Sequence, residues 1–569
     1  MLSKIIIENF KGIKYCEISD LGKVNVFVGR NNSGKSSILD ALCLIRSAFY
    51  PKLFDELIPH ILLRRKAAER SMYVLRNFWY NYDTTQRIKF NLEFKSGEKL
   101  NIEVLFISDS EFEILLEDPS GIMGRFIDGK YFGGMYIRLD GMISSQGNIK
   151  DIALRYPHIN TFLSEIVLID DYLARKLELL EIIAADRIYK QRYGKRLAEK
   201  LKEVYNVEAE TLTYIPVPSA PRKFRLSVET KDSYLHIDDM GDGTKYAMVI
   251  LFLCSLLKDT AFLVEEVESH QHSGAITKFI PKLVEIANQQ NVQLFLTTHS
   301  IEVLNVLSQL PEEYDIHLFY IENKNGYLDV KHLGRNVDFK ILLDLGVDPR
   351  FLEAYKKFII VEGDADIQFL KSLFKRYGKN IEELSYFVNA GSKDNVTTVL
   401  MALLSTKKDV VVTMDYDNED KNILNQKLHN ALKNKNYKIK SQKDNTLELE
   451  GDIKITLIPM GLYDDERLKQ IGINQFEMED YCLKLIDVDE NLSKWAGLKL
   501  EELIERAKMV AKAGIKINVY KSSSLLGILS SLKNMEPKNL IDYIISNANM
   551  QALEKVISDD LKKFLLELK

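Results

Sequence analysis

The sequence is poor in the residues on which several classes of protein depend. It has only four cysteines and two tryptophans in 569 residues. Cys16, Cys43, Cys254 and Cys482 stand far apart and form no C-x-x-C pair, which excludes a zinc ribbon and a disulfide framework. The longest apolar stretch, residues 246–257, is well short of the roughly 20 residues that cross a bilayer. We therefore expect a cytoplasmic protein with no membrane partner.

An excess of charge of one sign is also missing. The 77 basic and 82 acidic residues give a net charge of −5, with 46% hydrophobic and 28% charged residues. This composition excludes a globally basic nucleic-acid coat and a disordered chain, although a local basic surface remains compatible with nucleic-acid binding. At roughly 150 residues per domain, the length predicts two to four domains.

Patterns of apolar residues divide the chain into two α/β parts. Strand-like runs at 4–10 and 23–28 open the chain, and alternation at 86–106 predicts a hairpin around Ser96-Gly97. Residues of about 150–205 have helical periodicity and predict an inserted helical arm. A new strand, 357–361, starts a second unit. We expect one domain at 1–349, with the insertion, and a second at 350–569.

A phosphate-binding loop follows the strand at 23–28. The residues Gly29-Arg-Asn-Asn-Ser-Gly34-Lys35-Ser36 match G-x-x-x-x-G-K-[ST] between a strand and a helix. Backbone N–H groups of such a loop surround phosphate, Lys35 reaches the terminal phosphates and Ser36 ligates Mg²⁺. The motif predicts an ATP site with one Mg²⁺, formed by Gly29, Asn31, Asn32, Gly34, Lys35, Ser36 and Ser37.

The order of later motifs narrows the class of ATPase. Gly241-Asp-Gly243 precedes a strand that ends in Glu265-Glu266, and the next strand ends in His299. This order resembles the ABC-type ATPases of the SMC and RecF kind. The resemblance implies that Glu266 polarises the attacking water, His299 senses the γ-phosphate, and Gly241 and Gly243 cap the nucleotide of another subunit. It departs at Glu265, where Asp is usual, and at the signature Met-Gly-Asp-Gly-Thr-Lys.

Acidic residues follow two strands of the second part. Glu362 and Asp366 come after the strand at 358–361, and Asp415 and Asp417 after the strand at 410–414. Because alternate residues of an extended segment point the same way, we expect Asp415 and Asp417 to converge at the carboxyl edge of a sheet. Four such carboxylates repel one another unless Mg²⁺ or Mn²⁺ lies among them.

E-G-x-x-D followed by D-x-D resembles the Toprim fold of topoisomerases, primases and OLD (overcoming lysogenization defect) nucleases. Glu477-Met-Glu479 resembles the later Ser-x-Glu motif of OLD nucleases, so the resemblance carries over to Glu479 but not to Glu477. These nucleases also use a lysine near the C-terminus. Lys521, after a strand-like stretch at 515–520, is our choice, and Lys516 is the alternative.

The two resemblances together cover nearly the whole chain and match the arrangement of OLD-family nucleases and the related Gabija-type defence nuclease. They imply a nucleotide-regulated DNA endonuclease that uses two metal ions at Glu362, Asp366, Asp415, Asp417 and Glu479, in anti-phage defence or DNA processing. Glu362, Asp415, Lys521 and Glu266 are the expected catalytic residues. They also imply a homo-oligomer, a dimer or tetramer, in which the helical arm supplies contacts between subunits. A helicase-like partner protein is compatible with the same arrangement.

Two other functions remain open from the residues. One is a Toprim ribonuclease effector that the ATPase controls, with RNA as substrate. The other is a RecF-like or SMC-like DNA-binding repair ATPase without nuclease activity. A run of seven lysines without an acidic residue, at 421–443, begins just after Asp417 and suggests a path for a phosphate backbone.

Overall fold

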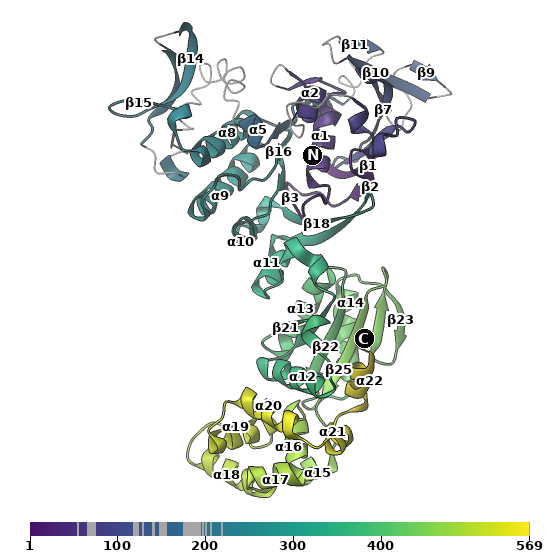
Figure 1. Ribbon diagram of the computed structural model, residues 1–569, viewed down its shortest axis with the longest axis vertical. Coiled ribbons are helices and arrows are strands. Elements are labelled where there is room, and N and C mark those ends of the chain that lie inside the picture. Colours follow the sequence, from purple (N-terminus) through teal and green to yellow (C-terminus); the bar gives the residue numbers. More distant parts are fainter. Residues whose placement is uncertain are drawn as a thin grey trace. The chain divides into compact units, whose positions relative to one another are not determined.

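The computed structural model describes the chain except for residues 54–55, 65–74, 118–124, 128–129, 139–142, 147–155, 175–194, 196–197, 200–201, 205–207, 218–219 and 568–569. The chain forms two compact units, which are described separately (Figure 1). The N-terminal unit comprises residues 1–343 and 348–351, and the C-terminal unit comprises 344–347 and 352–569. The connection is therefore interleaved, because a short segment of the first unit lies between two segments of the second.

A mixed sheet of fourteen strands, counted in the described residues, forms the N-terminal unit. Thirteen follow in the order β11-β10-β8-β7-β6-β1-β2-β19-β18-β3-β17-β16-β12, and β9 pairs with β10. The strands are β1 (Leu2–Phe10), β2 (Ile13–Ile18), β3 (Val24–Val28), β6 (Ile88–Phe94), β7 (Lys99–Ser108), β8 (Glu111–Glu117), β9 (Arg125–Ile127), β10 (Lys130–Arg138), β11 (Ile143–Gln146), β12 (Val167–Ile169), β16 (Ala261–Val264), β17 (Gln293–Thr297), β18 (Ile316–Lys324) and β19 (Tyr327–Arg335).

The parallel part of this sheet positions the nucleotide motifs. β12, β16, β17, β3 and β18 pair in parallel. All residues of β3, β16 and β17 are buried, as expected for strands that are covered on both faces. Among its described residues, the α-helices of the unit are α1 (Lys35–Arg46), α2 (Ile58–Arg64), α4 (Pro157–Ser164), α5 (Asp171–Ala174), α8 (Asp242–Leu256), α9 (Ser273–Gln289), α10 (Ile301–Ser308) and α11 (Asn336–Asp344).

Antiparallel strands complete the N-terminal unit. The predicted hairpin at 86–106 is confirmed as β6 and β7, which pair around the turn at Gly97. Two smaller sheets consist of β4 (Lys52–Leu53) with β5 (Glu56–Leu57), and of β13 (Thr211–Val217), β14 (Ala220–Glu229) and β15 (Tyr234–His236).

The expectation of a helical arm at about 150–205 needs a correction in its first part. Val167–Ile169 forms β12, which pairs in parallel with β16 at the edge of the main sheet. This apolar triplet is buried, because pairing satisfies its backbone while its side chains join the core. α4 and α5 flank it. Most of the predicted arm, including residues 175–194, lies outside the described residues.

The C-terminal unit is an α/β layer followed by helices. Its six-stranded sheet has the order β21-β20-β22-β25-β24-β23, and the first four strands are parallel. The strands are β20 (Lys357–Val361), β21 (Tyr386–Asn389), β22 (Asp409–Asp415), β23 (Ile439–Lys443), β24 (Thr446–Leu449) and β25 (Lys454–Met460). The predicted strands that precede Glu362 and end near Asp415 are confirmed, and they are neighbours in the sheet.

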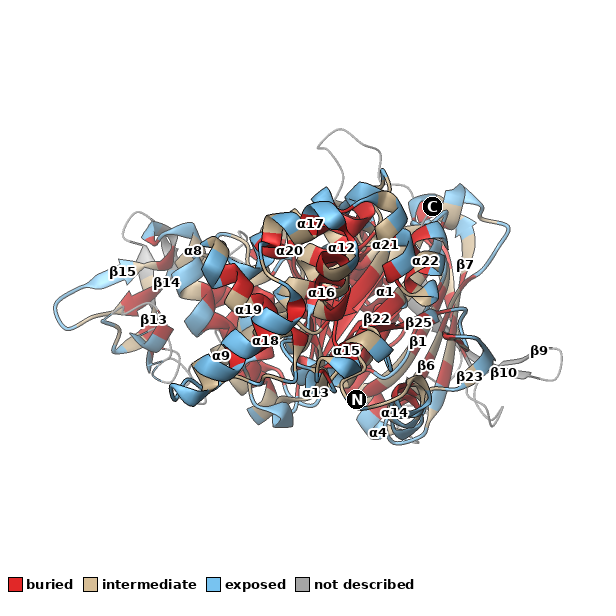
Figure 2. Cartoon of the chain, turned by 90° about the horizontal axis from the view of Figure 1, so that it is seen from below, coloured by how far each residue is buried: buried red, intermediate tan, exposed pale blue. Residues whose placement is uncertain are grey.

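Helices α12 (Asp364–Arg376), α13 (Lys393–Leu404) and α14 (Lys421–Asn434) follow individual strands of this sheet. Further helices complete the unit: α15 (Glu466–Gln470), α16 (Glu479–Val488), α17 (Glu490–Ala496), α18 (Leu500–Lys512), α19 (Ser522–Lys533), α20 (Pro537–Asn547), α21 (Met550–Val556) and α22 (Asp559–Glu567). They share one hydrophobic core with α12 and the sheet, which includes Phe369, Tyr481 and Leu525. Figure 2 shows buried strands and helix faces with exposed outer faces. No helix within the described residues is both long and apolar enough to span a membrane.

Candidate functional site

The phosphate-binding motif forms the turn between β3 and α1. Gly29 and Gly34 have φ angles of 141° and 100°, which favour glycine. A Cβ atom on Gly29 would lie 2.3 Å from the backbone oxygen of Ile321, and one on Gly34 would lie 2.7 Å from a methyl group of Leu328. Both glycines are therefore required by backbone conformation and by space, and the loop passes close to β18 and β19.

Lys35 extends back across this loop. Its Nζ donates hydrogen bonds of 2.9 Å to the backbone oxygens of Gly29 and Arg30, and the side chain is buried. Asn31 and Asn32 are exposed on the loop, while Ser36 and Ser37 lie in the first turn of α1. An ammonium group beside the N-terminus of a helix is the arrangement that binds a phosphate anion.

Glu265 and Glu266 follow β16, next to the strand that leads to His299. The backbone N–H of Glu266 donates to Oγ1 of Thr297 on β17 at 2.8 Å, and Glu266 has a φ of 49°. The Tyr246 hydroxyl, on α8, donates to the backbone oxygens of Glu265 and Glu266 at 3.0 and 3.3 Å. The structure thus places both glutamates at the carboxyl end of β16, which β17 separates from β3 in the sheet.

His299 is partly buried at the same edge. Burial lowers the pKa of its imidazole, and the ammonium of Lys35 and the guanidinium of Arg350 lower it further. The influence of Lys35 means that the predicted phosphate sensor and the phosphate-binding lysine are close. A lowered pKa keeps the imidazole neutral near pH 7.

The glycine-bearing signature begins α8. Gly241 is its N-cap residue, and a Cβ atom on Gly243 would lie 2.4 Å from the backbone oxygen of His270. Gln271 Nε2 donates to the backbone oxygen of Gly243 at 2.7 Å. The signature is therefore packed against the loop that follows Glu265 and Glu266.

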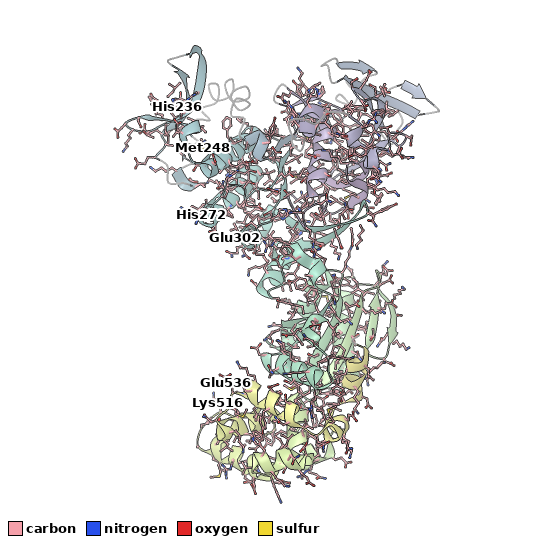
Figure 3. All side chains as sticks on the ribbon, in the orientation of Figure 1. His236, Met248, His272, Glu302, Lys516 and Glu536 are labelled. Carbon is pink, nitrogen blue, oxygen red and sulfur yellow. The ribbon has the colours of Figure 1, made fainter. Side chains whose placement is uncertain are left out.

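Glu268, His270 and His272 in that loop turn to separate partners. Glu268 Oε1 accepts from the backbone N–H of His299, and His270 Nε2 lies 2.6 Å from Asp171 Oδ1. His272, labelled in Figure 3, caps α9 by accepting from the Gly274 N–H. The three side chains therefore bind different partners and do not converge on one point.

In the C-terminal unit, neighbouring strands bring together acidic residues. Glu362 follows β20, and its Oε1 accepts from the backbone N–H of Asp415 at the end of β22, at 2.8 Å. Asp415 Oδ1 accepts from the Met478 N–H at 3.1 Å, which ties the start of α16, where Glu479 lies, to the same edge. Asp366 Oδ2 accepts from the Gly363 N–H in the first turn of α12.

Burial and mutual repulsion disturb these carboxyl groups. Burial raises the pKa of Glu362 to about 7, that of Asp366 to about 6 and that of Glu479 to about 8, with further increases from acidic neighbours. Burial, Asp366 and Glu362 raise the pKa of Asp415 well above its ordinary value. We refer to Glu362, Asp366, Asp415 and Glu479 as the carboxylate cluster.

The carboxylate cluster has the chemistry of a site for a divalent cation. Oxygen ligands with concentrated negative charge suit Mg²⁺ and Mn²⁺, and a cation would relieve the repulsion that the raised pKa values reveal. Within the described part of the chain, no group of three His, Cys, Asp or Glu side chains is arranged so that it could already hold a metal ion. The donor set fits, and the side chains are held mainly by backbone N–H groups.

Asp417 differs from the expected geometry. Its φ is 50°, and its backbone pairs with Phe476 by hydrogen bonds of 2.6 and 2.9 Å. This left-handed residue lies beyond the end of β22, so the extended segment stops before it, and its charge still helps to raise the pKa of Glu362. Burial opposes ionisation of Asp417, but Lys393 and Lys521 outweigh it and lower the pKa.

Two lysines contact Asp417. Lys393 Nζ and Lys521 Nζ each lie 3.2 Å from a carboxylate oxygen of Asp417, and Lys521 Nζ also lies 3.4 Å from Glu477. The structure thus brings Lys521 to Asp417 and Glu477, although residues 515–520 form no regular strand. The alternative Lys516 is exposed at the surface (Figure 3).

Sequence reasoning missed Lys393 and Glu477. Lys393 begins α13, shortly after β21 ends. Residues that follow parallel strands lie at the same edge of the sheet, so the argument that identified Glu362 also applies to Lys393. Glu477 is buried, accepts from the Ser523 N–H, and contributes to the raised pKa of Asp366. The motif comparison gave Glu477 no role because it stands where the motif has Ser, and its contacts are with residues distant in the sequence.

The lysine run at 421–443 is largely neutralised. Four of its seven lysines have acidic partners: Lys421 with Asp560, Lys427 with Glu419, Lys438 with Glu450, and Lys440 with Asp452. These pairs weaken the hypothesis that the run follows a phosphate backbone.

Comparisons with known proteins match the first part of the chain to an ATPase domain. The family of the AAA ATPase domain matches residues 1–130 and 142–304, just over half of the chain. An ATP/GTP phosphatase of Helicobacter pylori is 22% identical over 373 residues, which cover 60% of this chain and 97% of that protein.

Two further similarities are more distant. An OLD nuclease of Thermus scotoductus is 22% identical over 331 residues, or 53% of this chain, and the chain spans 59% of that nuclease. The SMC head domain from Thermotoga maritima is 15% identical, with a TM-score of 0.31, 58% of this chain and 97% of that chain being covered.

Proposed function

The chain belongs to the family of AAA ATPase domains, and we propose that its ATPase regulates a divalent-metal-dependent DNA endonuclease in the C-terminal unit. The carboxylate cluster is the observation that carries the proposal. Four carboxyl groups, one buried and three partly buried, gather near the carboxyl ends of two parallel strands, and lysines contact the neighbouring Asp417. Such a cluster is costly for a purely structural core. The similarity to an OLD nuclease supports the same activity.

In the N-terminal unit, the proposed activity is ATP hydrolysis. The loop from Gly29 to Ser36, with Ser37 and the ammonium of Lys35, binds the phosphates, and Ser36 and Glu265 assist with Mg²⁺. Glu266 orients the attacking water, and His299 faces the γ-phosphate as a neutral imidazole. Gly241 and Gly243 cap nucleotide in a second copy of the chain, so we propose a homo-oligomer.

In the C-terminal unit, the proposed activity is phosphodiester hydrolysis by a nuclease of the Toprim type. Glu362, Asp366, Asp415, Glu479 and Asp417 would hold Mg²⁺ or Mn²⁺, which supplies Lewis acidity and an activated water when bound. Two such ions are expected. Lys521, with Lys393 beside it, holds the phosphate in place and offsets charge that develops on its oxygens. Asp417 orients both ammonium groups before substrate arrives.

Cleavage of supercoiled and linear plasmid DNA tests the proposal. The full chain is assayed with Mg²⁺ or Mn²⁺, with and without ATP, beside Glu362→Gln, Lys35→Ala and the control Glu536→Gln. Glu536 is an exposed residue at the start of α20 (Figure 3). We expect metal-dependent cleavage, at least a hundredfold slower in Glu362→Gln, unchanged in Glu536→Gln, and with an altered ATP response in Lys35→Ala.

The same variants separate the alternatives. Cleavage of matched RNA but not DNA would favour a ribonuclease effector. ATP-dependent DNA binding without cleavage of either substrate would favour a repair ATPase and contradict the nuclease. Equal cleavage by Glu362→Gln and the unchanged chain would also contradict the proposal.

A further inference from the structure

A short segment of the connection between the units belongs to the N-terminal unit. Residues 348–351 pack with that unit, whereas residues 344–347 and 352 onward belong to the C-terminal unit. The segment contains Asp348 and Arg350 at the start of a 3-10 helix, Pro349–Ala354. No motif of the ATPase includes these residues.

Arg350 is fixed by two kinds of contact. Its Nε and Nη2 donate to the Asp348 carboxylate at 2.9 and 2.6 Å, and its Nη1 donates to the backbone oxygen of His299 at 2.6 Å. Only 19% of the Arg350 side chain is exposed. Because the guanidinium is planar, its fork on Asp348 determines where the remaining N–H group points.

The backbone of His299 is therefore held on both sides. Its N–H donates to Glu268 Oε1 at 2.6 Å, and its carbonyl oxygen accepts from Arg350. Glu268 follows β16 by four residues, so one contact comes from the loop after Glu266 and the other from the segment at 348–351. Both hydrogen bonds involve a charged partner, which makes them stronger than neutral ones.

The charges around Arg350 agree with this arrangement. Asp348, followed by Glu302 and Glu268, raises the pKa of Arg350 although burial opposes the shift. Glu302 lies in the first turn of α10, directly after the residues at the end of β17 (Figure 3). Three carboxylates thus favour the charged guanidinium at the backbone of His299.

We propose that Arg350 is a positioning residue of the ATPase, which holds the backbone of His299 so that the imidazole meets the γ-phosphate. This inference rests on the proposed ATPase function of His299. A misplacement of about 1 Å can reduce a rate by about a hundredfold. Binding of ATP depends mainly on the loop around Lys35, so loss of Arg350 affects turnover rather than affinity.

Steady-state ATP hydrolysis by the full chain tests the inference. The variants are Arg350→Ala, Arg350→Lys and Asp348→Asn, with Arg76→Ala as the matched control. Arg76 forms a similar fork on Asp109 at 2.7 and 2.6 Å in an exposed place. We expect kcat to fall at least tenfold in Arg350→Ala, with KM for ATP and the thermal midpoint nearly unchanged.

The other variants keep the test decisive. Arg350→Lys retains the charge but cannot form the fork, and Asp348→Asn weakens the fork, so both should lie between the unchanged chain and Arg350→Ala in kcat. Arg76→Ala should keep full kcat. An unchanged kcat in Arg350→Ala overturns the inference. A joint loss of ATP affinity and thermal stability also overturns it, because that result shows that Arg350 only stabilises the fold. Absence of hydrolysis in the unchanged chain would contradict the ATPase instead.

Discussion

The four carboxyl groups of the carboxylate cluster, of which Asp366 is buried and the others are partly buried, dominate the chemistry of the C-terminal unit. Their raised pKa values mean that the folded chain binds protons which the unfolded chain has released. The stabilising effect of these protons is present below the unfolded pKa values, near 4, and is lost as the pH rises through about 6 to 8. On the proposed function, a divalent cation would replace the protons in that range.

This linkage predicts that the thermal midpoint of the metal-free chain falls between pH 5 and pH 8. We expect a decrease of about 5 °C, and its reversal by millimolar Mg²⁺ or Mn²⁺. Differential scanning fluorimetry with chelator or metal measures both effects. Glu362→Gln should flatten the curve, because it removes one titrating group, and a midpoint that rises over this range would contradict the assignment.

Gly29 is a second residue whose chemistry is set by its surroundings. Gly29→Ala would push a methyl group against the backbone oxygen of Ile321 at a φ of 141°. We expect at least tenfold weaker binding of a fluorescent ATP analogue, since the loop must open to accept the methyl group. Gly12→Ala is the control, because nothing lies within 4 Å of a Cβ atom there. Equal affinities for the two variants would argue against this loop as the site.

Among secondary-structure elements, α8 deserves the closest experimental test. It begins with the signature glycines and holds the turn after β16 through the Tyr246 hydroxyl. Gln271 adds a return contact to the backbone of Gly243. The helix therefore links the signature, which is proposed to face a second copy, with the glutamates of its own site.

We expect Tyr246→Phe to lower the free energy of unfolding by about 1 kcal/mol, because the backbone oxygens of Glu265 and Glu266 lose the hydroxyl that donates to them. ATP hydrolysis should fall several-fold, since Glu265 and Glu266 lose a support of their turn. Chemical denaturation and a phosphate-release assay measure these effects. The control is Tyr234→Phe, whose hydroxyl is exposed. Identical behaviour of the two variants would show that the α8 contact does not matter.

For the molecule as a whole, we propose that binding of ATP promotes the association of copies of the chain. If signature glycines of one copy cap the nucleotide of another, trapped ATP should increase the mass of the particle. We expect Glu266→Gln with ATP to double in mass by light scattering, because the unhydrolysed nucleotide remains between copies. Lys35→Ala should not respond to ATP. Identical masses for Glu266→Gln with and without ATP would contradict assembly through the nucleotide.

The amino-acid sequence by itself determined the parts of this protein that depend on neighbouring residues. The loop from Gly29 to Ser36, the hairpin around Gly97, and the acidic residues at the ends of β20 and β22 follow from local spacing, turn residues and apolar patterns. Helix and strand periods are visible within about ten residues, so short windows were sufficient. The same reasoning placed Lys521 near the carboxylates only through a family resemblance.

Tertiary structure decided which distant residues meet. β12 joins the main sheet because its apolar triplet pairs with β16, which lies about a hundred residues later in the chain. The apolar periodicity of the residues around β12 predicts a helix instead. Glu477 reaches Lys521, and Arg350 reaches the backbone of His299, through packing that no local pattern records. Asp417 adopts a left-handed φ because its backbone pairs with Phe476. Long-range contacts overrule local preference, since burial and hydrogen bonding outweigh the small differences in intrinsic propensity.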